Sequence, residues 1–303
     1  MNVLRPLVVA ELAEPVDPRV SAMAEALAAR FPGAARAVLF YGSCLRERAL
    51  DGLMLDFYLI VSSYREAYGK RWLAAANRLI PPNVFPFEHD GLVAKYAVLS
   101  EADFARECGM MARSVSVWAR FAQPSRLVWA ADAAAAERAV AAVADAAPTL
   151  FQLTLPMMPP EQGASVQDIW ERGFSLTYGA ELRAERTGKA RSVVEADPER
   201  YARFGEAALH EVAMRPGAAP GAAAGRPERM ARRWKGMQRK GKALSVLRLA
   251  KASATFAGGA DYLAWKINRH AGTDIVLKPW QRRWPLLAAV TLLPRLLKRG
   301  AIR

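Results

Sequence analysis

Residues 38–62, VLFYGSCLRERALDGLMLDFYLIVS, decide how the rest of the chain is arranged. Two apolar runs are separated by a Gly-Ser pair and a polar segment, a pattern that predicts a strand, a tight turn and a second strand. The second run, residues 53–61, contains Asp56. Because burying an unpaired carboxylate is costly, Asp56 is expected to meet a metal ion, a cation or hydrogen-bond donors. The residues alone leave open whether Asp56 has a catalytic role or only forms a salt bridge.

The Gly42-Ser43 pair after the first strand has two interpretations. Gly42 permits a close approach of the backbone to a ligand, and Ser43 can begin a helix whose first N–H groups point at an anion. Phosphate at this turn, with a metal ion on Asp56, is the arrangement that nucleotidyl transfer needs. The simpler interpretation is that Gly-Ser forms an ordinary turn.

A third strand is predicted at residues 92–100, LVAKYAVLS, where Lys95 interrupts the apolar run as Asp56 interrupts the second strand. The side chain of Lys95 can neutralise the charge of a triphosphate. Alternatively, it is an edge lysine whose aliphatic stem covers apolar surface while its charge reaches water.

The segment between these strands predicts a helix and then a loop. Residues 62–80 have helical periodicity, with Tyr68, Trp72 and residues 75–79 expected to face inward. Residues 81–91 contain three prolines and an Asp-Gly pair, which favour a loop.

Further helices are indicated by apolar periodicity and capping residues. The predicted helices span residues 17–31, 100–108, 132–146 and 149–155, and a further one begins at residue 165. Asp17 and Ser100 are expected to cap the first two. Residues 110–129 predict a helix followed by a short strand. Residues 215–227, RPGAAPGAAAGRP, have the composition of a flexible linker.

The composition of the 303 residues, 52% of them hydrophobic, suits two compact domains or one large domain with an appendage. The two cysteines, Cys44 and Cys108, make no disulfide framework and favour a reducing compartment. We expect no secretory signal and, because no uninterrupted apolar stretch of about 18 residues occurs, no spanning helix. The scattered histidines, His89, His210 and His270, predict no metal cluster.

The net charge of +14 is concentrated in the C-terminal quarter. Residues 229–303 hold 18 Lys and Arg against 2 acidic residues, a balance of +16, whereas the remainder holds 25 basic and 27 acidic residues, a balance of −2. A cationic tail favours nucleic acid or an anionic membrane. Trp280 and Trp284, beside the apolar residues 286–293 and flanking Arg and Lys, favour a helix in a bilayer interface. The alternative is a core helix of a small third domain.

Four blocks of this sequence, taken together, resemble the mitochondrial translocator assembly and maintenance family of peripheral phosphatidate cytidylyltransferases. The blocks are LFYGSCLRER, MLDFYLIVSS, GLVAKYAVLSEADF and LTYGAELR, in residues 39–48, 54–63, 91–104 and 176–183. A weaker fifth block is SVLRLAKASATFAGGADYLAWKI in residues 245–267.

The resemblance implies an α+β protein in three functional parts. These are a nucleotidyltransferase-fold domain (1–108), a winged-helix-like helical domain (109–214) and, after the linker, a basic amphipathic membrane-binding segment (228–303). It implies that CTP and phosphatidic acid give CDP-diacylglycerol and pyrophosphate with Mg2+. It also implies a bacterial-type relative, peripheral on the cytoplasmic face of the inner membrane, with no nucleic-acid partner.

The matched blocks assign the site residue by residue. Asp56 and Lys95 are the expected catalytic residues, and the nucleotide-binding residues are Gly42, Ser43, Arg46, Arg48 and Tyr96. The family's Arg-Gln pair is Glu47-Arg48 here, so the choice between Arg46 and Arg48 for the phosphate stays open. Asp56 is expected to hold Mg2+ with a second carboxylate, for which Glu181 in the fourth block is favoured over Asp51.

Two other functions are compatible with the residues. One is a nucleotidyltransferase-fold protein that acts on RNA or protein and binds nucleic acid through its basic tail. The other is a catalytically inactive scaffold. It is suggested by Tyr58, which occupies the position where nucleotidyltransferases place a second strand carboxylate.

Overall fold

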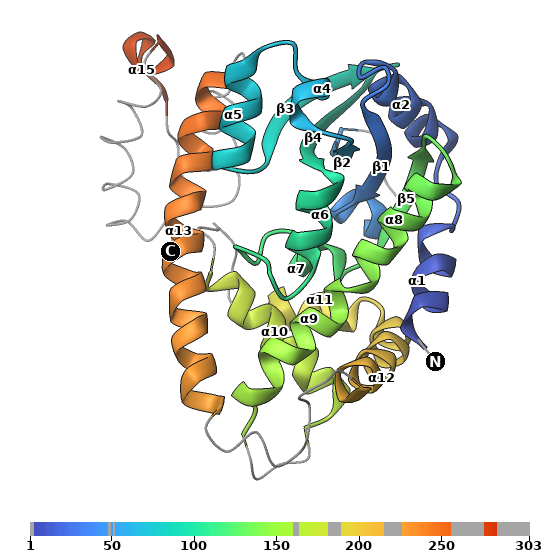
Figure 1. The fold of residues 1–303 in the computed structure, drawn as a ribbon, viewed down its shortest axis with the longest axis vertical. Helices are drawn as coiled ribbons and strands as arrows, with labels where there is room; N and C mark the ends of the chain where they lie inside the picture. The colour runs from blue at the N-terminus through green and yellow to red at the C-terminus, as the bar shows by residue number, and fades with distance from the viewer. Residues whose placement is uncertain are drawn as a thin grey trace.

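The computed structural model describes residues 3–47, 50, 52–159, 164–180, 189–214, 226–255 and 276–283. The protein is α+β, with one mixed sheet of five strands in the order β3-β4-β2-β1-β5 (Figure 1). The strands are β1 (Ala35–Tyr41), β2 (Met54–Val61), β3 (Asn83–His89), β4 (Leu92–Ser100) and β5 (Ser125–Ala130). The three strands expected at 37–41, 53–61 and 92–100 are thus confirmed as β1, β2 and β4.

The sheet is buried on both faces, which explains why its central strands are apolar except at Asp56 and Lys95. In β1, Leu39 and Tyr41 belong to the core on one face, whereas Val38 and Phe40 belong to the core on the other. The strands β2 and β4 are parallel, and the other three pairings are antiparallel.

Helices cover the sheet on both sides. The face that includes Val38 is covered by α2 (Pro18–Ala29), α4 (Tyr64–Ala67) and α5 (Arg71–Leu79). The face that includes Leu39 is covered by α1 (Leu4–Leu12), α6 (Glu101–Cys108), α7 (Trp118–Phe121) and α8 (Ala133–Ala144). The same core continues into α9 (Ala146–Thr154), η1 (Leu155–Met157), α10 (Val166–Tyr178), α11 (Lys189–Glu195) and α12 (Pro198–Met214).

Side-chain caps fix the starts of several predicted helices. Asp17 accepts a hydrogen bond from Arg19 N, Ser100 accepts one from Asp103 N, and Asp132 accepts one from Ala135 N. Ser165 and Asp168 form a reciprocal capping box at the start of α10. The helices expected at 17–31, 100–108 and 132–146 are therefore confirmed. They could be predicted because a capping residue is a local sequence signal.

The prediction of a loop at residues 81–91 is wrong. Most of it is β3, which forms a hairpin with β4 through Asp90 and Gly91. Both turn residues have positive φ, 47° and 76°, as a type I′ hairpin turn requires. Pro86 is tolerated because β3 is an edge strand, where a missing N–H donor breaks no inner ladder.

Of the residues expected to face inward in this segment, Tyr68 and Asn77 are buried, but the prediction is wrong for Trp72 and Leu79. Trp72 and Leu79 are 54% and 75% exposed, whereas Asn77 is fully buried. Asn77 Nδ2 donates to Val98 O at 2.9 Å, and Asn77 Oδ1 accepts from Asn83 N. The helix is therefore held to β3 and β4 through an amide side chain, which apolar periodicity does not reveal.

The sheet draws one strand from beyond residue 108, where the sequence placed the end of the first domain. β5 pairs with β1 through Tyr41 and Ser125, so a domain that ended at residue 108 would lack an edge strand. In the described part of 109–214 the remaining elements are helices. The linker is outside the described residues except for 226 and 227.

The helix α13 (Arg226–Thr255) runs along one side of the molecule, from the helical part to the sheet (Figure 1). Trp234 is almost completely buried, and its Nε1 donates to Leu153 O at 2.9 Å. At the other end, Arg248 and Lys251 donate to the carbonyls of residues 80–82, directly after α5. This part of the expected membrane segment therefore places its Trp234 and Met237 in the protein core.

We predict opposite effects for two glycines of α13. A Cβ on Gly241 would overlap the carbonyl oxygen of Ala180, whereas a Cβ on Gly236 would meet open space. We expect Gly241→Ala to lower the free energy of unfolding by about 1–3 kcal/mol through overpacking. We expect Gly236→Ala to raise it by about 0.5–1 kcal/mol through helix propensity. Urea unfolding measures both, and equal effects would contradict the docking of α13.

One described segment, Ala133–Met157, is long and apolar enough to cross a membrane by length and composition alone. It comprises α8, α9 and η1, and most of it is buried inside the protein. Leu150 and Phe151 in its centre are fully buried against other helices.

Candidate functional site

A row of side chains crosses the sheet where β1 ends and β2 begins. Tyr41 pairs with Asp56 in the β1–β2 register, and Asp56 pairs with Lys95 in the β2–β4 register. Directly paired residues on neighbouring strands place their side chains on the same face, roughly 5 Å apart. The sheet register therefore brings together the two residues that interrupt the predicted strands.

Asp56 and Lys95 form an ion pair, with Lys95 Nζ 2.8 Å from Asp56 Oδ1. The side chains are 19% and 26% exposed, so both reach the surface of the protein. β4 lies between β3 and β2, which rules out the edge-lysine interpretation of Lys95. Of the partners expected for Asp56, namely a metal ion, a cation or hydrogen-bond donors, the structure shows a cation, Lys95, and the pair is partly exposed.

Gly42 lies directly against the second oxygen of Asp56. Its φ of +98° is strained for any residue with a side chain, and an added Cβ would be 2.9 Å from Asp56 Oδ2. Ser43 begins the short helix α3 (Ser43–Glu47) and is exposed. Cys44 Sγ donates to Met54 O at 3.5 Å, which ties α3 to the start of β2.

We predict that Gly42→Ala impairs the site itself rather than the fold alone. Gly33 has a similar φ of +73° but open space around its Cβ position, so Gly33→Ala is the matched control for backbone strain. Both variants should lose about 1 kcal/mol of stability, the usual cost of a left-handed backbone for a residue with a Cβ. Only Gly42→Ala should also weaken ligand binding at Asp56, which isothermal titration with nucleotide and Mg2+ would measure. Equal binding by the two variants would contradict this role of Gly42.

A further cation lies beside this row and has no signal in the sequence. Arg120 of α7 places its guanidinium carbon 5.0 Å from the centre of the Tyr41 ring. Tyr41 directly precedes Gly42, so the charge of Arg120 lies near the glycine turn. Sequence reasoning missed Arg120 because only the packing of α7 on the sheet brings it there.

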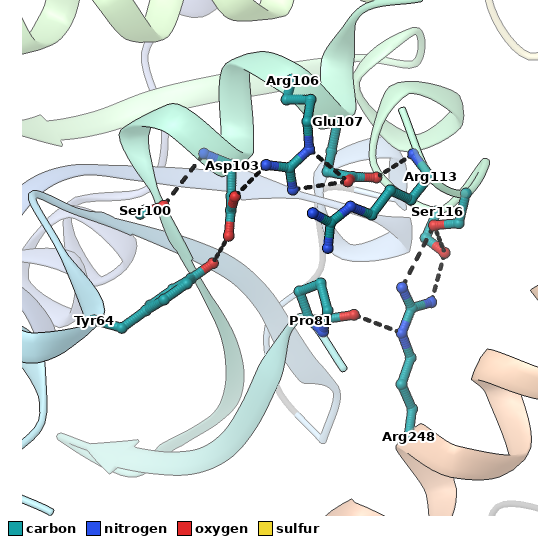
Figure 2. Close-up of polar contacts among 10 residues, drawn as sticks. Tyr64, Pro81, Ser100, Asp103, Arg106, Glu107, Arg113, Ser116 and Arg248 are labelled. Carbon is teal, nitrogen blue, oxygen red and sulfur yellow. Dashed lines mark hydrogen bonds and ion pairs between the residues drawn. The ribbon is translucent and has the colours of Figure 1, made fainter. Parts of the chain in front are cut away.

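A polar network fixes α6, which directly follows β4 (Figure 2). Tyr64 Oη donates to Asp103 Oδ2 at 2.5 Å, and Arg106 pairs with both Asp103 and Glu107. Glu107 Oε2 also accepts from Arg113 N at 3.1 Å. These contacts hold α6 to α4 and hold the segment after α6 against α6.

A second group of hydrogen bonds joins Arg248 of α13 to the segment that follows Arg113. Its guanidinium donates to Ser116 Oγ at 2.6 Å and to Ser114 Oγ at 3.4 Å, and its Nε donates to Pro81 O at 2.7 Å (Figure 2). Arg248 therefore joins three segments that are distant in the sequence, and we assign it a structural role.

The remaining expected site residues are not all brought together. The side chain of Tyr96 lies on the opposite face from Lys95, among Phe31, Phe85 and Phe87. Burial raises the pKa of Tyr96, as expected for a phenol in an aromatic core. Arg48, Asp51, Glu181 and the side chain of Arg46 lie outside the described residues.

Asp56 is the one expected metal ligand that can be placed. Within the described ranges, no group of three or more His, Cys, Asp and Glu side chains gathers. Mg2+ commonly binds through one or two carboxylates, substrate phosphates and several waters. A single carboxylate beside a glycine turn could therefore supply one ligand to such an ion, and does not form a complete metal site by itself.

No model of a known protein family matches this chain, and no curated protein matches it in a sequence comparison.

Proposed function

We propose that this protein is a phosphatidate cytidylyltransferase that works at a membrane surface. The observation that carries the proposal is the convergence of Gly42, Asp56 and Lys95 at one end of the sheet. Nucleotidyl transfer needs a glycine turn whose backbone N–H groups can bind phosphate, a carboxylate that can bind a metal ion, and a lysine that can neutralise phosphate charge. On this proposal the sheet and its helices are a nucleotidyltransferase-fold core, and helices from α9 to α12 are the winged-helix-like part.

In the proposed reaction, a phosphate oxygen of phosphatidic acid attacks the α-phosphorus of CTP. A new P–O–P bond forms, the bond between the α- and β-phosphates breaks, and pyrophosphate leaves. The attacking phosphate monoester is already an oxyanion near neutral pH, so the chain does not need a strong general base. Its residues act by positioning and by charge neutralisation.

Each site residue has a defined part in this proposal. The backbone at Gly42 and Ser43 receives the triphosphate, and Lys95 exchanges its contact with Asp56 for one with the developing pyrophosphate charge. Asp56, with Glu181 or Asp51 as the second carboxylate, would hold Mg2+. When bound, the metal would supply Lewis-acid neutralisation of the phosphate oxygens.

The charge on the outer face of α13 favours a partner with an anionic surface. While Trp234, Met237 and Gly241 face the protein, the opposite side of the helix carries a stripe of four exposed cations. Their spacing of 3, 4 and 3 residues places them on one helical face, and they are Arg232, Lys235, Arg239 and Lys242. An anionic leaflet attracts such residues by about 1 kcal/mol per charge.

The test of the function is a turnover assay with the purified full chain. CTP, Mg2+ and phosphatidic acid in anionic vesicles should give CDP-diacylglycerol and pyrophosphate in equal amounts. Nucleotide binding without lipid product would show that the acceptor is wrong, and RNA and protein acceptors would then be assayed. Absence of nucleotide binding would favour an inactive scaffold.

We predict that the cationic stripe of α13 governs vesicle binding. Replacement of its four residues by Gln should weaken binding to anionic vesicles by about 10²-fold or more, since each charge contributes about 1 kcal/mol. The matched control replaces four exposed arginines on other helices by Gln: Arg138, Arg172, Arg191 and Arg203. Vesicle co-sedimentation measures both, and similar losses would mean that net charge alone is responsible. Truncation after residue 224 is a poorer test, because it also removes Trp234 from the core.

A further inference from the structure

We propose that α5 is a second lipid-contacting element, which inserts Trp72 and Leu79 into the interface of an anionic bilayer. These are two of the most exposed large apolar side chains in the described part of the chain. They lie two helical turns apart, about 10.5 Å along the helix, on the same side. Ala75 lies between them and is also exposed.

The orientation of α5 is imposed by its buried side. Asn77 is held between Val98 O and Asn83 N, and Asn83 Nδ2 donates to Leu73 O at 3.1 Å. Rotating the helix to bury Trp72 and Leu79 would break these buried hydrogen bonds, each of which is costly to leave unmade. The apolar stripe therefore stays on the surface.

The charges around the stripe select the partner. Between Glu66 and Glu88 the chain contains three basic residues, Lys70, Arg71 and Arg78, and no acidic one. All three are exposed. Tryptophan and leucine flanked by Lys and Arg on an exposed helix are typical of an element that lies in the interface of an anionic membrane.

A second copy of this chain is a poorer partner for the same surface. In a two-fold symmetric contact, the stripe of one molecule would meet the identical stripe of the other. The cations of both copies would then face each other with no acidic residue of α5 to compensate them. The observations therefore favour a lipid surface over self-association.

The position of α5 fits joint action with α13. Arg248 and Lys251 of α13 donate to the carbonyls of Ile80, Pro81 and Pro82, which immediately follow α5. The two helices thus share one side of the molecule (Figure 1). The choice of a lipid partner rests in part on the proposed function, whereas the exposed stripe of α5 does not.

A fluorophore at residue 79 tests insertion directly. Cys44 and Cys108 are buried, so Leu79→Cys in the full chain can be labelled selectively with an environment-sensitive dye. With vesicles that contain phosphatidylglycerol, the emission should shift to the blue and be quenched by brominated acyl chains. The control is Val9→Cys, an exposed site on α1, whose emission should not change. An aqueous spectrum at residue 79 in vesicle-bound protein would overturn the proposal.

Binding and turnover separate this proposal from the proposed function. Trp72→Ser combined with Leu79→Ser should weaken vesicle binding at least about tenfold, while Val9→Ser combined with Met214→Ser should not. The α5 variant should still convert short-chain phosphatidic acid dispersed below its micelle concentration at the wild-type rate. Wild-type affinity in the α5 variant, or a dimer that this variant abolishes, would overturn the α5 proposal. If the unmodified chain converted neither phosphatidic acid in vesicles nor dispersed short-chain phosphatidic acid, that result would count against the proposed function alone.

Discussion

Asp56→Asn is expected to reduce the formation of CDP-diacylglycerol by at least about 10²-fold, the usual scale for losing a preorganised charge at a reacting phosphate or carbonyl. Asparagine has the shape of aspartate but lacks its charge, so it can neither hold a metal firmly nor orient Lys95. The loss of stability should be small, about 1 kcal/mol or less. The reason is that Lys95 is partly exposed, so water can take the place of the Asp56 carboxylate beside its ammonium group.

The matched control for this variant is Asp103→Asn. Asp103 is 16% exposed and ion-paired with Arg106, so its burial and pairing resemble those of Asp56. The Asp103→Asn variant should keep near-normal turnover, since α6 lies outside the proposed site. If both variants lose stability and neither loses turnover, Asp56 serves only as a structural ion pair and the catalytic assignment fails.

Arg200→Met is expected to lower the free energy of unfolding by about 3–5 kcal/mol, the cost of leaving one charge of a buried pair alone. Arg200 is 4% exposed, and its guanidinium donates to both oxygens of Glu11 at 2.6 and 3.0 Å. It also donates to Ala122 O at 3.0 Å and lies 4.2 Å from the centre of the Phe204 ring. These contacts join α12, α1 and the end of α7, so Arg200 also supports the helix that carries Arg120.

Two variants check that burial sets this magnitude. Arg138→Met breaks the exposed pair with Glu101 and should cost less than about 1 kcal/mol. Arg200→Met combined with Glu11→Leu removes both buried charges and should recover much of the lost stability. Urea unfolding followed by circular dichroism measures all three, and equal costs for Arg200→Met and Arg138→Met would contradict the prediction.

The predictions that failed have a common physical cause. The sequence showed that α5 has apolar residues on one side, but not that Asn77 would pin the other side to the sheet. Prolines suggested a loop at residues 81–91, because an edge strand can be recognised only once the strand order is known. Within the segment 228–303, which was predicted to be basic and amphipathic, only the structure shows that Trp234 donates to a backbone carbonyl in the core.

The sequence by itself determined the local features of this protein: the strands at β1, β2 and β4, the capped helices, and the glycine turn beside an aspartate-bearing strand. These follow from periodicity, capping and backbone preferences within a few residues. Only the tertiary structure decided that Lys95 would be the partner of Asp56, that Arg120 would approach the turn, and that α5 would expose its apolar side. Such pairings depend on strand order, register and helix packing, and these are set by the burial of the whole chain rather than by any single segment.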